Sequence, residues 1–167
     1  MQIAAGPRRE FFPAAFYLGA IFAANGRDRE AAGTWQLALG TEPRPSFVYA
    51  LAADARIRDN APESAIEILT PAFARSPTDD ELGRRLAMAH LMISHYAEAL
   101  PIVQGYLSRH PADQDFLFAG VVAQYEVVRA GLTLSAADRD RVRTWAAAYK
   151  GEQGALVDKY LRAMGAR

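Results

Sequence analysis

Apolar residues recur along this chain at the spacing of one helix face, in segments bounded by Gly, Asn, Ser or Pro. No alternating apolar and polar pattern that would predict a β-strand persists. The pattern therefore predicts an all-α chain of about nine helices, at 12–24, 28–40, 46–58, 62–74, 80–92, 96–108, 114–130, 135–150 and 152–164.

Residues suited to ending a helix follow three of these segments. Gly26, Asn60 and Ser94 stand 34 residues apart, each just after an odd-numbered segment of the series. Gly and Asn tolerate the left-handed conformation that commonly ends a helix. We therefore expect the helices to be paired, with the first helix of each pair ending at these positions.

Three helix starts are also marked. Thr78 with Glu81 has the pattern of a capping box, in which a side-chain oxygen accepts from the exposed backbone N–H groups of the first turn. Ser135 with Asp138 predicts a similar N-cap. Pro62 suits a first helical turn because its missing N–H would have no partner there.

The same 34-residue period links small, large and proline positions, and 34 is a period of helix-turn-helix repeats. The first unit shows it most fully, and the next two keep most of it. The residues concerned are Leu18, Gly19, Phe22, Ala31, Trp35, Ala38 and Pro43, then Tyr49, Ala52, Ala53, Ala65, Leu69, Ala72 and Pro77, then Leu86, Ala87, Ala99, Val103, Tyr106 and Pro111.

On these residues the chain resembles the tetratricopeptide repeat family over about residues 12–113. The resemblance implies an α-solenoid, a right-handed superhelix of antiparallel helix pairs, with repeats at 12–45, 46–79 and 80–113. Arg56 and His90 stand where the first unit has Phe22, so we expect those two units to pack less ideally.

Both ends depart from the period. Thr133 stands where a small alanine is expected, so the period is predicted to stop near residue 131. Residues 114–167 are interpreted as a degenerate fourth repeat followed by C-terminal capping helices, which cover the last apolar face of an open stack. Residues 1–11 are interpreted as a linker or a remnant of upstream sequence. The Ala- and Arg-rich composition favours a segment of a longer bacterial protein.

Charge and cysteine content narrow the function classes. Nineteen basic and nineteen acidic residues give zero formal net charge with no basic block, which disfavours a nucleic-acid partner. The absence of cysteine excludes disulfides and thiolate metal sites. Arg8 and Arg9 before an apolar run resemble a signal peptide, but the run carries repeat residues and is too short to span a membrane. The compartment stays open between cytoplasm and periplasm.

The resemblance implies that function resides on a concave surface lined by the first helix of each pair. This groove is mostly apolar, with a charged patch in its middle, and it suits an amphipathic helix or an extended peptide. An alternative is that several of its side chains pack between neighbouring helices. The residues placed there are Phe16 and Ala20, then Phe47, Ala50, Asp54 and Arg58, then Glu81, Arg84, Arg85 and Met88, then Phe118, Val122 and Tyr125.

The sequence gives little support for a carboxylate clamp, a metal site or a catalytic site. Family members that clamp a chaperone's terminal carboxylate use Lys and Asn at set places, where this chain keeps only Arg85 as a suitable charge. His90, His95 and His110 do not place two imidazoles on one helix face, and the glycines form no phosphate loop. We therefore expect no enzyme, metal or cofactor.

Two functions remain open: a module that binds a protein or peptide in the groove, and a structural or oligomerisation segment that packs against another domain or copy.

Overall fold

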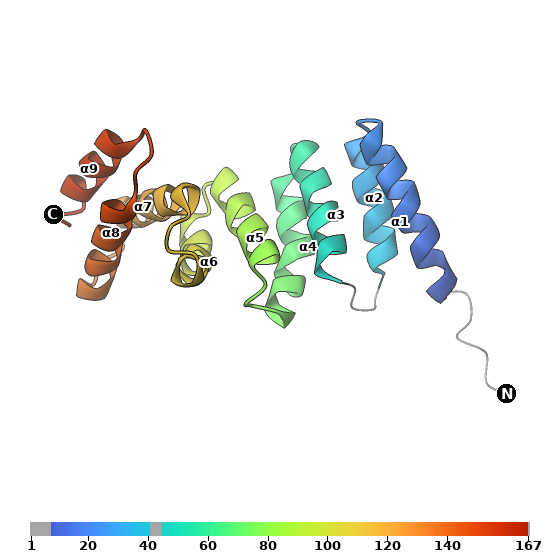
Figure 1. Ribbon diagram of the computed structural model, residues 1–167, viewed down its shortest axis with the longest axis horizontal. Helices are drawn as coiled ribbons and strands as arrows, with labels where there is room; N and C mark the ends of the chain where they lie inside the picture. The colour runs from blue at the N-terminus through green and yellow to red at the C-terminus, as the bar shows by residue number, and fades with distance from the viewer. Residues whose placement is uncertain (1–7, 41–44, 167) are drawn as a thin grey trace. The chain divides into compact units, whose positions relative to one another are not determined.

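The computed structural model describes residues 8–40 and 45–166, with side chains from Phe12 onward. Over these ranges the chain forms nine α-helices and no strand (Figure 1), which confirms the all-α prediction. The helices are α1 (Arg8–Ala24), α2 (Asp28–Leu39), α3 (Ser46–Arg58), α4 (Pro62–Arg75), α5 (Asp80–Met92), α6 (Tyr96–Arg109), α7 (Gln114–Arg129), α8 (Ala136–Ala148) and α9 (Gly154–Ala163).

Helix α1 begins at Arg8, earlier than the predicted start at residue 12. The helix continues through Pro13, which lacks the N–H for one backbone hydrogen bond. Residues 8–11, which the sequence assigned to a linker, are therefore helical. Residues 1–7 and the repeat proline Pro43 lie outside the described residues.

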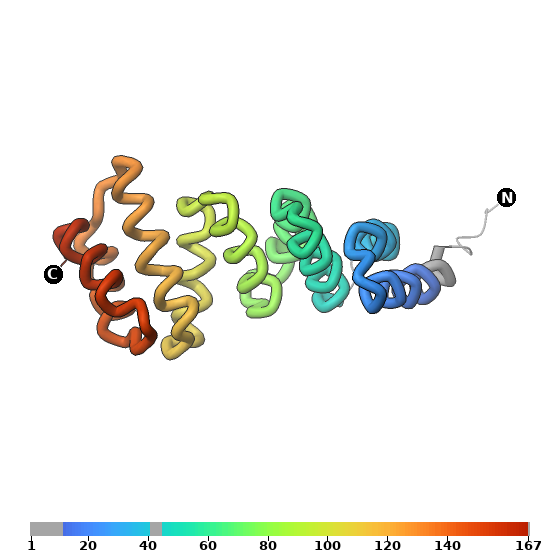
Figure 2. Tube along the Cα trace, turned by 90° about the horizontal axis from the view of Figure 1, so that it is seen from above, coloured from blue at the N-terminus to red at the C-terminus, as the bar shows by residue number. Residues whose placement is uncertain are grey.

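The chain divides into two compact units, Met1–Ala89 and His90–Arg167. In the first unit α1 packs on α2, α2 on α3, and α3 on α4, with neighbouring helices antiparallel (Figure 1). In the second unit α6 packs on α7, and α7 contacts both α8 and α9 (Figure 2). Each unit is described by itself below.

The predicted ends of the first helices are confirmed. Gly26, Asn60 and Ser94 have φ angles of 69°, 57° and 61°, in the left-handed region. After each one, the next backbone N–H donates to a carbonyl in the last helical turn, the hydrogen bond of a Schellman motif. These bonds are Arg27 to Phe22 at 2.9 Å, Ala61 to Arg56 at 2.8 Å and His95 to His90 at 2.9 Å.

Small residues let the paired helices approach closely. A Cβ atom on Gly19 would lie only 2.5 Å from Nε1 of Trp35, so the indole rests on the backbone of α1. In the second unit a Cβ on Gly120 would lie 2.9 Å from the ring of Trp145. The periodic alanines and the large residues after them are at most 2% exposed, as a packed helix pair requires: Ala31, Ala65, Ala99, Trp35, Leu69 and Val103.

The cap of α5 differs from its prediction. Asp79, rather than Thr78, accepts hydrogen bonds through Oδ1 from the N–H groups of Glu81 at 3.0 Å and Leu82 at 3.1 Å. The carboxylate is favoured because it also interacts with the positive end of the helix dipole. The capping box predicted for Thr78 is therefore wrong by one residue.

The other two marked helix starts are confirmed. Oγ of Ser135 accepts from the N–H of Asp138 at 3.1 Å and caps α8. Pro62 is the first residue of α4.

Helices α7 and α9 also end at left-handed glycines, in a register displaced from that of Gly26, Asn60 and Ser94. Gly131 ends α7 with a φ of 100°, and 34 residues later Gly165 ends α9 with a φ of 62°. The Schellman bonds recur there, from Leu132 to Val127 at 3.2 Å and from Ala166 to Leu161 at 2.9 Å. Helix α7 has 16 residues where α3 and α5 have 13, so the period is displaced by a longer helix.

Candidate functional site

Aromatic side chains from consecutive first helices meet in the first unit. The rings of Phe16 on α1 and Phe47 on α3 pack edge to face, with centroids 5.8 Å apart, and Phe12 stacks on Phe16 at 5.9 Å. Phe47 remains 46% exposed although this contact covers part of it. An exposed phenylalanine on a packed scaffold offers apolar area to a partner.

A two-pronged ion pair joins the next two first helices. Arg85 on α5 donates from Nε to Oδ1 of Asp54 at 2.8 Å and from Nη2 to Oδ2 at 2.9 Å. Glu81 lies 3.3 Å from the same guanidinium. Burial lowers the pKa of Arg85, but hydrogen bonds and charges from Asp54 and Glu81 outweigh it and hold the pKa above its usual value. The pair fixes α5 against α3.

Three more of the predicted groove residues are exposed in the first unit. Met88 on α5 is 43% exposed, one turn beyond Arg84 and Arg85. Arg84 and Ala20 are exposed as well. Apart from Arg58, the accessible or half-buried members of the predicted groove in this unit form what we call the first-helix surface: Phe16, Ala20, Phe47, Asp54, Glu81, Arg84, Arg85 and Met88.

Two predicted groove residues do not join this surface. Ala50 is only 2% exposed, because it packs between helices and leaves no area for a partner. Arg58 donates from Nε to Oδ1 of Asp28 at 2.8 Å, so its guanidinium is held at the first turn of α2. The charged patch predicted in the middle of the groove is therefore centred on the Asp54–Arg85 pair.

In the second unit the predicted residues of α7 already contact other helices of the unit. Phe118 packs on Tyr149 after α8, with ring centroids 5.7 Å apart, and Tyr125 stacks on Tyr160 of α9 at 4.3 Å. Val122 is half-buried. Phe118 and Tyr125 thus follow the alternative expectation, in which predicted groove residues pack against other helices of the domain.

Comparison with known proteins identifies the fold. No family model matches the sequence, and no curated protein matches it. A tetratricopeptide repeat protein from Parabacteroides merdae superposes with a TM-score of 0.71 at 15% identity, over 93% of this chain and 60% of that one. YrrB, described as a protein with an unusual peptide-binding site, gives 0.63 at 14% identity over 92% and 69%. MamA gives 0.63 at 15% identity over 96% and 76%. The chain has the tetratricopeptide repeat fold.

One packing position recurs near the end of each first helix in this tetratricopeptide fold. Phe22 occupies it in the first unit of the repeat, and polar residues follow at 34-residue intervals. Each has a buried polar atom without a hydrogen-bond partner among the described residues: Nε of Arg56, Nδ1 of His90 and Oε1 of Gln124.

His90 is a half-buried imidazole whose Nδ1 has no hydrogen-bond partner among the described residues. Burial lowers the pKa of His90, His95 adds to the effect, and the charge of Glu98 opposes it. An unpaired buried polar group costs about 1–3 kcal/mol, so this tetratricopeptide position limits stability.

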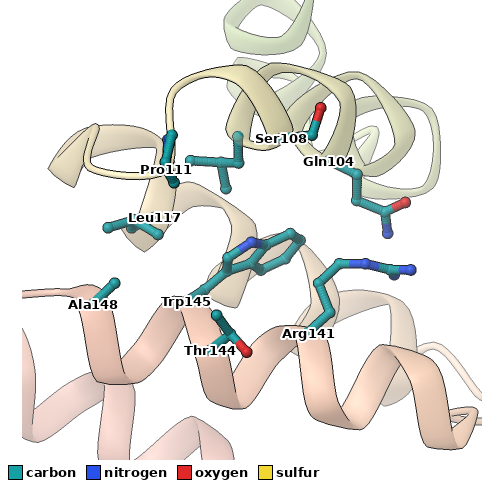
Figure 3. Close-up of a pocket in the computed structure, with 9 residues that line it drawn as sticks. Gln104, Ser108, Pro111, Leu117, Arg141, Thr144, Trp145 and Ala148 are labelled. Carbon is teal, nitrogen blue, oxygen red and sulfur yellow. The ribbon is translucent and has the colours of Figure 1, made fainter.

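The second unit contains one pocket that was not predicted from the sequence (Figure 3). The indole of Trp145 faces α6 across a space of about 210 Å³, with Pro111 and Leu117 on one side and Gln104 and Arg141 on the other. Small-molecule sites span about 300–1,000 Å³, so this space suits a single side chain. It lies between second helices of the tetratricopeptide pairs, whereas the resemblance directed attention to first helices. The sequence signal that could have predicted this pocket is Gly120, because its missing side chain leaves room for the indole of Trp145.

Residues 8–40 and 45–166 contain no group of three or more His, Cys, Asp or Glu side chains that could hold a metal ion. None of the helices in the described part of the chain is long and apolar enough to cross a membrane.

Proposed function

We propose that this tetratricopeptide domain is a protein-interaction module that binds a peptide segment of another protein on the first-helix surface. The observation that carries the proposal is the exposure of Phe47 and Met88, at 46% and 43%, on the two helices joined by the Asp54–Arg85 pair. Large apolar side chains on a rigid scaffold are suitable anchors for a partner. The domain acts by binding, with no catalytic step and no cofactor.

The composition of the surface indicates the kind of segment. Burying one large apolar side chain contributes about 1.5–3 kcal/mol. Two such anchors contribute about 3–6 kcal/mol before the entropy of ordering a peptide is subtracted, which corresponds to roughly millimolar affinity, so a tighter partner must make further contacts. The guanidinium of Arg85 is already paired with Asp54 and Glu81, so the apolar anchors carry recognition and polar contacts add to it at the rim of the surface.

Helix α7 contributes less than the sequence suggested. Phe118 and Tyr125 offer a partner only the area that Tyr149 and Tyr160 leave exposed. The similarity to YrrB, described as having a peptide-binding site, supports a peptide as the partner class.

A displayed peptide library selected against the immobilised protein tests the proposal. We expect enriched peptides to bind wild type and to lose at least about tenfold in affinity with Phe47→Glu or Met88→Glu, since about 1.4 kcal/mol corresponds to a factor of ten. Leu37→Glu is the matched control, because Leu37 is 67% exposed on the second helix α2. Selected peptides that bind all variants equally would overturn the proposal.

A further inference from the structure

The two tryptophans of the chain rest on helix backbones through different edges of the indole ring. A Cβ on Gly19 would meet Nε1 of Trp35 at 2.5 Å, and this nitrogen donates to the carbonyl of Phe16 at 3.0 Å. A Cβ on Gly120 would instead meet the ring carbons Cε3 and Cζ3 of Trp145, each at 2.9 Å. The nitrogen of Trp145 therefore lies away from its contact with the α7 backbone.

The indole N–H of Trp145 is a hydrogen-bond donor that the described protein leaves unused. The side chain is only 7% exposed, and its N–H has no acceptor among the described residues. A buried tryptophan N–H usually finds a partner, and it can only donate. The nitrogen is not among the unpaired atoms that are sealed from solvent in the described ranges, so it is open to the space beside it. Figure 3 shows it on the side of the ring that faces α6, where the pocket lies.

The pocket beside this nitrogen suits an uncharged group. Its one charged lining residue, Arg141, is already paired with Asp138 at 2.6 Å. A charged occupant would have to leave water for apolar walls, which is costly. Besides the indole, the apolar lining residues are Leu107, Pro111, Leu117 and Ala148.

Tyrosine is the uncharged side chain that best combines an apolar body with an acceptor for the indole N–H. The side chains of Phe, Leu, Ile and Val have no acceptor, Trp only donates, and the sulfur of Met accepts weakly. Ser and Thr bring little apolar area, and the amides of Asn and Gln bring more polar groups than the apolar walls can satisfy. The flat ring of tyrosine can pack against an indole, and its hydroxyl oxygen accepts.

We propose that the pocket between α6 and α8 takes the phenol ring of a tyrosine from a partner protein, with the indole N–H of Trp145 donating to the phenol oxygen. The side chain of Gln104 lines the pocket and has no hydrogen-bond partner among the described residues (Figure 3), so its amide oxygen, or water at the rim, can accept the phenol's own proton. The site lies in the second unit and does not rest on the function proposed for the first-helix surface.

NMR of the two indole N–H groups tests the proposal. The probe is p-cresol, which is the isolated side chain of tyrosine, and toluene is the matched control without the hydroxyl. We expect p-cresol to move the Trp145 N–H proton downfield as the hydrogen bond forms, with half-saturation in the millimolar range. Ring-current shifts are common to both probes, so a Trp145 N–H that does not move, or that moves equally with both, overturns the proposal.

The same spectrum holds an internal control. The N–H of Trp35 is already bonded to the carbonyl of Phe16, so its resonance is expected to stay in place. The variant Trp145→Phe assigns the two signals. A Trp35 resonance that follows that of Trp145 would overturn binding at the pocket.

Two leucine substitutions on α8 locate the binding. Ala148→Leu adds volume at a lining residue and is expected to remove the p-cresol shift, whereas Ala147→Leu, at an exposed neighbour that does not line the pocket, is expected to retain it. Circular dichroism checks that each variant is folded. A shift that both folded variants retain overturns the pocket as the site, and the comparison of p-cresol with toluene on wild type decides the question without the variants.

A short glycine peptide with one central tyrosine separates a partner's side chain from a free phenol. We expect this peptide to give the same downfield shift as p-cresol, and the matching peptide with phenylalanine to give none. A response to p-cresol without a response to the tyrosine peptide would assign the pocket to a free small phenol and overturn the proposal of a partner's tyrosine.

Discussion

The indole of Trp35 lies on the α1 backbone at Gly19, and its Nε1–H donates a hydrogen bond to the carbonyl of Phe16 at 3.0 Å. This contact fixes α1 against α2 within the first unit. Phe16 in turn packs on Phe47 of α3. The tightest contact of a repeat pair therefore positions one of the aromatic side chains of the first-helix surface.

Gly19→Ala is expected to destabilise the protein by about 1–3 kcal/mol, because the added Cβ forces the indole to shift and weakens its hydrogen bond. Urea denaturation monitored by tryptophan fluorescence measures the change. Gly33→Ala is the control, because no atom lies within 4 Å of its added Cβ and the substitution favours helix by up to about 1 kcal/mol. Equal effects of the two substitutions would contradict the close approach of Trp35.

Two substitutions at helix ends are expected to change the stability of the protein in opposite directions. Gly26→Ala is expected to cost about 1 kcal/mol, because φ is 69° and no neighbour crowds the added Cβ, so only the backbone conformation is strained. Ser94→Gly is expected to stabilise by about 0.5–1 kcal/mol through relief of the same strain. Thermal unfolding by circular dichroism measures both; the same sign for the two would argue against a shared left-handed cap.

The ends and pairings of the helices could be predicted because they depend on local residue type. Only residues such as Gly and Asn readily take a positive φ, and Gly26 and Asn60 lie in the left-handed region. The cap at Asp79 could not be distinguished from Thr78, because both side chains accept hydrogen bonds and the start of α5 decides between them. The change of register after α7 was not predicted, because the three additional residues of this helix carry no recognisable local signal in the sequence.

The Asp54–Arg85 pair should show measurable coupling. A double-mutant cycle with Asp54→Ala and Arg85→Ala is expected to give about 0.5–1 kcal/mol at low salt, since both side chains are partly buried, at 30% and 25% exposure. The coupling should shrink at about 1 M NaCl, where the screening length is about 3 Å. Arg29 with Asp59 is the control pair, because Arg29 is 79% exposed. Equal coupling in both pairs would contradict a structural role for Asp54.

The lowered pKa of His90 predicts a pH dependence. Because the folded state disfavours the protonated imidazole, the unfolded chain binds more protons below the ordinary pKa of 6.5. The free energy of unfolding therefore falls as the pH drops from about 7.5 to about 5. His90→Phe, which copies Phe22 of the first unit, should reduce this slope. Urea denaturation at the two pH values measures it, and a slope that His90→Phe leaves unchanged would contradict a contribution from His90.

The candidate site was less predictable than the fold. The resemblance placed positions on a surface, but burial depends on what the neighbouring helix brings. Ala50 is covered, Arg58 is held by Asp28, and Tyr125 is stacked on Tyr160. These partners lie on other helices, and a period along one chain does not say how their side chains meet.

The most direct test of a peptide-binding first-helix surface is the methyl NMR spectrum of the methionines during titration with a library-selected peptide. Met88 is 43% exposed on the surface, whereas Met164 of the second unit is 7% exposed. The Met88 methyl resonance is expected to shift in proportion to peptide binding while that of Met164 stays in place. A peptide that binds and leaves the Met88 resonance unchanged would contradict it.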